Sequence, residues 1–169
     1  KGLNDSGACN LDVDCSIGED WEDLKEHNKR SAGILLSGGS GFCSGALINN
    51  TSNDGTPYFL TANHCFSNPS SWAFRFGWIS PNPVCASNTP STDGPTNMTI
   101  SGATEIARDA GSDFALVEIN QAIPEDWDRV FAGWDRSDIT PDFTVGIHHP
   151  SGDIMKVCRD NDQPTQTIN

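Results

Sequence analysis

A histidine and an aspartate in this sequence have the surroundings expected of a catalytic pair. The apolar, β-prone run from Pro57 to Ala62 leads into His64 and Cys65, and Asp113 directly precedes the apolar run from Phe114 to Ile119. A histidine acts as a general base toward a hydroxyl nucleophile when a carboxylate sets its tautomer and orientation. A carboxylate entering an apolar strand needs a partner, because an unpaired buried charge is very costly. These residues predict nucleophilic catalysis, with His64 as the base and Asp113 as the orienting acid.

Short strands are expected to position both residues. Apolar runs separated by glycine-, proline- and asparagine-rich turns predict strands at Ile34–Leu36, Phe42–Ile48, Tyr58–Ala62, Met98–Ala107, Asp113–Ile119, Phe143–His148 and Ile154–Cys158. The segment from Trp72 to Trp78 alternates strictly and places four aromatic residues on one face, which indicates a core strand. Many short strands with frequent turns favour an all-β barrel or sandwich.

Several sequence blocks, taken in order, resemble the trypsin-like serine peptidases, and more closely the secreted lysyl endopeptidases. These blocks are Cys9–Cys15, Cys43–Asn50, Tyr58–Cys65, Ser112–Glu118, Ala132–Asp138 and Gly146–Pro150. The resemblance implies a trypsin-like antiparallel β-barrel, with the first barrel followed by the opening hairpin of a second. We expect an N-terminal arm over residues 1–30, the first barrel with the histidine and aspartate of the triad over 31–123, and the inter-barrel connection and start of the second barrel over 124–169.

The resemblance also implies a function, namely a secreted serine endopeptidase that cleaves protein or peptide substrates after lysine. The family's nucleophile lies in a G-x-S-G-x-P segment downstream of the aspartate, and no such segment occurs between Asp113 and Asn169. We therefore expect an N-terminal part of the catalytic domain that is inactive alone and needs the C-terminal part of the same enzyme. The alternative is a non-catalytic binding or structural module derived from the same barrel. We expect a monomer without a cofactor.

Six cysteines suggest an oxidising compartment, and their spacing alone allows fifteen pairings. The resemblance implies disulfides between Cys15 and Cys85 and between Cys43 and Cys65. It also implies that Cys9 pairs with a cysteine in the family's downstream half, while Cys158 has no clear counterpart. Cys9 and Cys158 could therefore pair with each other, or both could pair with residues outside this sequence.

Other candidate residues have simpler interpretations. Ser40 precedes both His64 and Asp113, against the family order, and Ser151 lacks a glycine two positions before it. His148 and His149, with Asp153 nearby, suggest a metal site, but adjacent strand residues point to opposite faces. We therefore expect no metal site, and a metal-dependent hydrolase that uses His64 and these two histidines is the weakest hypothesis.

The net charge of the chain limits the classes of partner that it is expected to bind. A net charge of −13 argues against nucleic acid and anionic membranes, and it is compatible with attraction to cationic peptides. The apolar runs are too short to span a bilayer. Between Glu19 and Arg30, acids precede bases in the order that suits a helix dipole, but a solvated charge cluster is the favoured interpretation.

Overall fold

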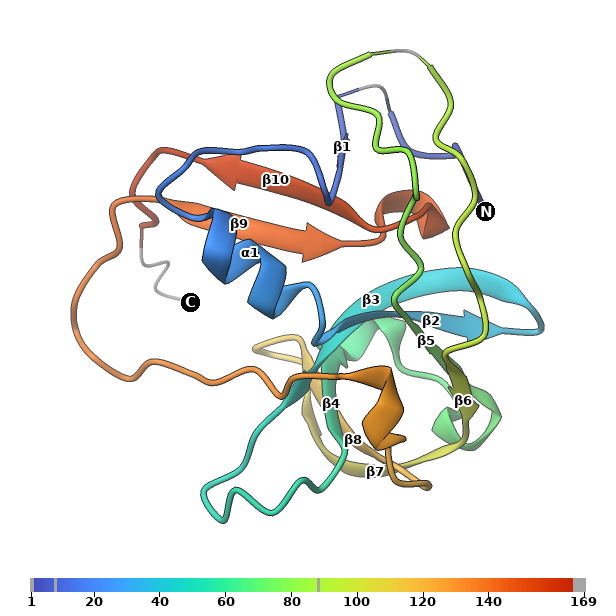
Figure 1. Cartoon of the computed structure of the whole chain (residues 1–169). Helices are drawn as coiled ribbons and strands as arrows, with labels where there is room; N and C mark the ends of the chain where they lie inside the picture. Colours follow the sequence, from blue (N-terminus) through green and yellow to red (C-terminus); the bar gives the residue numbers. More distant parts are fainter. Residues whose placement is uncertain (1, 8, 88, 166–169) are drawn as a thin grey trace.

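The chain folds into two antiparallel β-sheets and one short α-helix within residues 2–7, 9–87 and 89–165, which a computed structural model describes (Figure 1). The larger sheet has seven strands in the order β6-β5-β2-β3-β4-β8-β7 and curls into a half-barrel. The smaller sheet has three strands in the order β1-β10-β9. This architecture is of the predicted all-β barrel class.

The strand bounds follow the apolar runs of the sequence closely. The seven-stranded sheet comprises β2 Ala32–Ser37, β3 Ser40–Ile48, β4 Tyr58–Ala62, β5 Ala73–Phe76, β6 Thr99–Ser101, β7 Ala103–Asp109 and β8 Phe114–Ile119. The three-stranded sheet comprises β1 Leu11–Asp12, β9 Thr144–His148 and β10 Lys156–Asp160. The helical segments are α1 Glu22–Asn28 and the short 3-10 turns η1 Asn63–Cys65, η2 Pro69–Ser71, η3 Glu125–Trp127 and η4 Pro150–Gly152.

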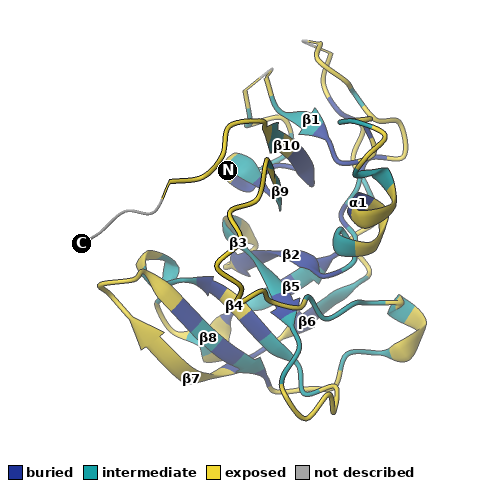
Figure 2. Cartoon of the chain, turned by 90° about the vertical axis from the view of Figure 1, so that its left-hand side faces the viewer, coloured by how far each residue is buried: buried dark blue, intermediate teal, exposed yellow. Residues whose placement is uncertain are grey.

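Aromatic side chains form the core of the half-barrel. Trp72, Phe74 and Phe76 are fully buried, as the alternation of their segment predicts (Figure 2). Phe59 of β4 packs edge-to-face on Phe74, with ring centroids 5.0 Å apart. Burying each such side chain stabilises the fold by about 1.5–3 kcal/mol. The core therefore fixes the position of β4, the strand that leads to His64, within the sheet.

Two local predictions were wrong. Met98–Ala107 is not one strand, because Gly102 has φ +86 and donates its N–H to the Trp72 carbonyl, which separates β6 from β7. The solvated charge cluster is a helix, α1, whose Lys25 is buried. The Lys25 ammonium donates to the Cys15 carbonyl at 2.6 Å and pairs with Glu22 at 2.7 Å. These partners compensate the cost of burying the charge.

The N-terminal arm contributes a strand to the smaller sheet. Residues Leu11 and Asp12 pair with Val157 and Lys156, so β10 lies between β1 and β9. The hairpin of β9 and β10 was expected, whereas its third strand was not. Among the described residues, no helix is long and apolar enough to cross a membrane.

Candidate active site

His64 lies in the tight turn η1 that directly follows strand β4. Cys65, the last residue of this turn, is joined by a disulfide to Cys43 of β3. On the other side, β4 pairs with β8 in a register that places Ala62 opposite Phe114. This register places the start of β8, and with it Asp113, beside the turn that carries His64.

The carboxylate of Asp113 contacts His64 at two points. Oδ2 of Asp113 lies 2.7 Å from Nδ1 of the His64 ring, and Oδ1 accepts the backbone N–H of His64 at 2.8 Å. The Asp113 carbonyl also accepts the N–H of Asn63 at 3.0 Å. Asp113 has φ +54, a left-handed conformation that aspartate tolerates better than most residues. The structure thus brings the two sequence-predicted residues together.

These contacts lower the pKa of Asp113 and set the tautomer of the His64 ring. Hydrogen bonds from the ring and from the backbone N–H of His64 hold the pKa of Asp113 below its usual range. A carboxylate only accepts hydrogen bonds, so Nδ1 carries the proton and Nε2 of the neutral ring keeps its lone pair. The His64 side chain is 71% exposed, and no residue in the described part of the chain hydrogen-bonds to Nε2. The basic nitrogen is therefore open to a reactant.

Arg108 is a neighbour of this site that no sequence pattern indicates. Its Nη1 donates to Oδ1 of Asn63 at 3.3 Å, and its guanidinium lies over the ring of Phe66, 4.6 Å from the centroid. Arg108 therefore contacts the residues on both sides of the His64–Cys65 pair. No sequence motif marks it, because the contact depends on the pairing of β7 with β8.

The two alternative serines belong to other structural features. Ser40 begins β3 at the β2–β3 hairpin, and Ser151 lies in η4 with φ +57. Within the described ranges, neither serine makes a hydrogen bond to His64.

His149 is a buried structural residue. Its backbone N–H donates to the Ser44 hydroxyl at 2.8 Å, its Nδ1 donates to the Asp153 carbonyl at 2.9 Å, and its ring stacks on Trp78. Desolvation by burial lowers its pKa to about 4, against the smaller opposing effect of the Asp153 carbonyl. The pKa of the half-buried His148 is also lowered by desolvation. The contacts of His149 connect the smaller sheet to β3.

Potential metal ligands gather at one place in the part of the chain that the structure describes. This group consists of Cys43, His64 and Cys65. The two sulfur atoms are joined in a disulfide, so neither is available as a thiolate ligand.

The cysteines divide into two bonded pairs and two free residues. Cys15 is bonded to Cys85, and Cys43 to Cys65. Cys9 and Cys158 are exposed, and they are not bonded to each other.

Comparison with known proteins identifies the family. A family model described as "Lysyl endopeptidase, C-terminal domain" matches residues 3–169. The chain belongs to the lysyl endopeptidase family. A lysyl endopeptidase from Pseudomonas aeruginosa is 26% identical over 167 residues, which cover 95% of this chain and 36% of that protein. This member of the family thus spans about a third of the length of the curated relative it matches.

A solved structure supports the fold of this lysyl endopeptidase family member. Human heparin binding protein, which has a trypsin-like fold, matches with a TM-score of 0.53 and 13% sequence identity. The match covers 79% of this chain and 60% of that protein. At this identity the likeness concerns the fold alone, and it confirms the predicted trypsin-like class.

Proposed function

We propose that this chain is part of a secreted serine endopeptidase that cleaves after lysine, with His64 as general base and Asp113 as its orienting acid. The single observation that carries the proposal is the double contact of the Asp113 carboxylate with the ring and backbone of His64. Membership of the lysyl endopeptidase family supports the same interpretation. Two disulfides suit an oxidising, extracellular compartment.

The arrangement of His64 and Asp113 suits the proton transfers of an acyl-transfer reaction. Nε2 of His64 takes the proton of a serine hydroxyl as its oxygen attacks the scissile carbonyl, and then gives that proton to the leaving amine. Asp113 keeps the proton on Nδ1 and stabilises the imidazolium formed in between. The anchored turn η1 holds the ring in place, which limits the reorientation needed during reaction.

We propose that the nucleophile is supplied by a segment downstream of Asn169, after the hairpin of β9 and β10. In this proposal residues 1–30 form the arm, 31–123 the first barrel, and 124–169 the connection and the start of the second barrel. Residues 1–169 alone are then inactive. The preference for lysine follows the name of the family and of its Pseudomonas aeruginosa relative, and a net charge of −13 favours cationic substrates.

The test compares this chain with a longer protein that continues beyond it. The longer protein should react stoichiometrically with an organophosphonate serine probe and cleave peptides with lysine, rather than arginine or leucine, before the scissile bond. Residues 1–169 alone should not be labelled. Labelling of the short chain would refute the placement of the nucleophile, and an unreactive longer protein would favour the non-catalytic module.

A matched pair of variants tests the roles within the site. In the longer protein, Asp113→Asn should lower kcat by about 10⁴-fold, because the amide cannot hold the productive tautomer of His64. Asp109→Asn is the control, since Asp109 is an exposed carboxylate nearby that accepts hydrogen bonds from Ser112 instead. Equal activity of the two variants would contradict the role of Asp113.

A further inference from the structure

The lysines of this chain are few, and those that the structure describes are buried or largely covered. The sequence has lysine at positions 1, 25, 29 and 156, and position 1 lies outside the described residues. The side chains of Lys25, Lys29 and Lys156 are 1%, 16% and 5% exposed. Lysine is mostly exposed in folded proteins, and it is almost never fully buried unless paired. The distribution here is the reverse of the usual one.

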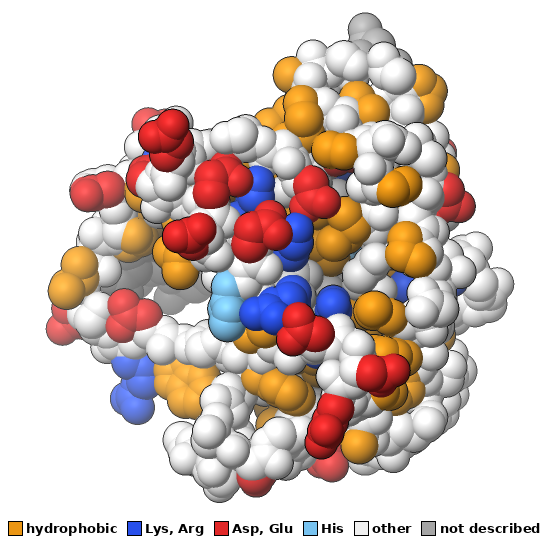
Figure 3. Space-filling model, viewed as in Figure 1, with side chains coloured by type: hydrophobic (Ala, Val, Ile, Leu, Met, Phe, Trp, Pro, Cys, Tyr) orange, Lys and Arg blue, Asp and Glu red, His pale blue; other side chains and the backbone are white. Residues whose placement is uncertain are grey.

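Two of these lysines are held by α1. Lys25 lies inside the helix and is bonded to the Cys15 carbonyl and to Glu22. Lys29, at the C-terminal cap, pairs with Asp14 and Glu26, each at 2.6 Å, and its backbone N–H donates to the Lys25 carbonyl. Acidic and basic side chains are intermixed over this face of the molecule (Figure 3). The backbone at both lysines is helical or capping, not extended.

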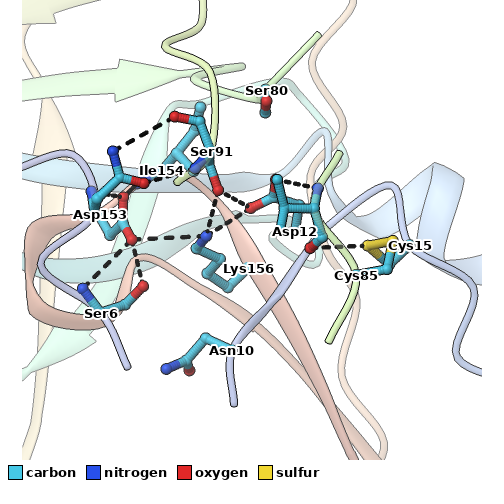
Figure 4. A network of polar contacts seen from close by, with 12 residues as sticks. Ser6, Asn10, Asp12, Cys15, Ser80, Cys85, Ser91, Asp153, Ile154 and Lys156 are labelled. Carbon is cyan, nitrogen blue, oxygen red and sulfur yellow. Dashed lines mark hydrogen bonds and ion pairs between the residues drawn. A yellow bond between two sulfur atoms is a disulfide. The ribbon is translucent and has the colours of Figure 1, made fainter. Parts of the chain in front are cut away.

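The third lysine lies in a buried polar network. Lys156 belongs to β10, the middle strand of its sheet, and its backbone is paired with Asp12 on one side and His148 on the other. Its ammonium donates to Oδ1 of Asp12 at 2.6 Å and to the Ser91 hydroxyl at 3.0 Å, and it lies 3.6 Å from Asp153 (Figure 4). Exposing the bond that follows Lys156 would require opening both strand pairs and this network.

Among the described residues, the exposed cations are arginines. The Arg108 side chain is 47% exposed, and the partly buried Arg30 is 31% exposed. Arg136 lies in the segment 133–142, in which every residue is exposed and none belongs to a helix or strand. Exposed irregular segments are the preferred sites of proteolytic nicking. The peptide bond after Arg136 therefore lies in an exposed, irregular segment that a peptidase can bind. None of the bonds after the described lysines lies in such a segment.

We propose that this fold protects the protein against cleavage by its own lysine-directed activity, because the lysines that the structure describes are buried or held in ion pairs and exposed positions carry arginine. The inference rests on the proposed lysine preference. A peptide bond must lie in an accessible, flexible segment to be cut, so cleavage after Lys25, Lys29 or Lys156 requires local unfolding that first breaks their ion pairs. The rate of such cleavage is then limited by the small population of the opened state.

The experiment adds a separate lysine-specific endopeptidase to the folded, disulfide-bonded chain and identifies the products by mass spectrometry. The folded chain should resist cleavage at positions 25, 29 and 156, and the reduced, denatured chain should be cut at all three. Arg136→Lys should add one cut, after position 136, at least about 100-fold faster than any of these three in the folded chain. Arg159→Lys is the matched control and should stay uncut, since Arg159 lies in β10, is 18% exposed and pairs with Asp20.

Two results would overturn the proposal. One is cleavage of the folded wild type after Lys25, Lys29 or Lys156 at a rate near that of Arg136→Lys. The other is an uncut Arg136→Lys variant under conditions that digest the denatured chain. Because the peptidase is supplied from outside, the outcome does not depend on the activity of this protein. The substrate preference of the longer protein tests the proposed function separately.

Discussion

The buried His149 should make the folded protein sensitive to mild acid. Burial lowers its pKa from 6.5 to about 4. As the pH falls below 6.5, the unfolded chain takes up a proton on this residue, while the folded chain keeps it neutral until about pH 4. The unfolded state therefore binds more protons in this window, and stability falls as the pH falls.

The size of this loss of stability follows from the difference between the pKa of His149 in the unfolded and in the folded chain. One pKa unit corresponds to about 1.4 kcal/mol, so the full displacement is worth about 3 kcal/mol, lost by the time the pH is below 4. Between pH 7 and pH 5 the same linkage gives a loss of about 2 kcal/mol. The carboxylates with lowered pKa, such as Asp153, withdraw their stabilisation at lower pH and do so with or without His149.

Urea unfolding followed by tryptophan fluorescence measures the effect, with His149→Phe as the comparison. The phenylalanine ring can still stack on Trp78 but does not titrate. The variant will be less stable at both pH values, since it lacks the hydrogen bond to the Asp153 carbonyl. Its loss between pH 7 and pH 5 should nevertheless be smaller than that of the wild type by about 2 kcal/mol. Equal pH dependence of the two proteins would refute the reasoning.

Three further predictions concern stability in denaturant unfolding. Phe74→Ala should lower the free energy of unfolding by about 3–5 kcal/mol, because this side chain is fully buried in the aromatic core. Leu60, whose side chain is 38% exposed, provides the control as Leu60→Ala, which should cost much less. A similar loss for both variants would contradict the assigned core. Replacing Cys43 and Cys65 together with serine should lower the free energy of unfolding by about 3 kcal/mol, since the disulfide closes a loop with a sequence separation of 22. An unchanged denaturant midpoint of unfolding would count against this contribution. Asp12→Asn should cost about 3–5 kcal/mol, because it removes the nearer of the two carboxylates beside the buried Lys156, at 2.6 Å, and leaves only Asp153 at 3.6 Å. The exposed Asp5 provides the control as Asp5→Asn, and comparable losses would argue against the buried pair.

The sequence predicts where the strands lie better than it predicts which strands pair. Alternation from Trp72 to Trp78 predicted the buried aromatic face, because side chains of a strand point to opposite sides in turn. The strand leading to His64 and the strand following Asp113 could be predicted for the same reason. Their contact could be expected from the family resemblance, but local pattern alone does not specify which strands pair.

The features that were missed depend on long-range contacts. The sequence near Lys25 predicts a solvated charge, and its burial depends on the Cys15 carbonyl, outside α1, which accepts a hydrogen bond from its ammonium. Lys156 is buried only because Asp12, from the other end of the sequence, lies beside it. Strand β1 has two residues, too few for any periodicity to reveal it. In each case the deciding partner is distant in sequence or in a different element, and composition near the residue gives no sign of the contact.

The pairing of β1 with β10 has a consequence for biosynthesis. Residues 11 and 12 find their strand partners at 157 and 156, whereas the seven-stranded sheet needs only residues 32–119. On the ribosome, the half-barrel can assemble as soon as its own residues have emerged, but the N-terminal arm must wait until β10 has been made. Residues 11 and 12 are therefore synthesised before the half-barrel but can enter their own sheet only after residues 156 and 157 have been made.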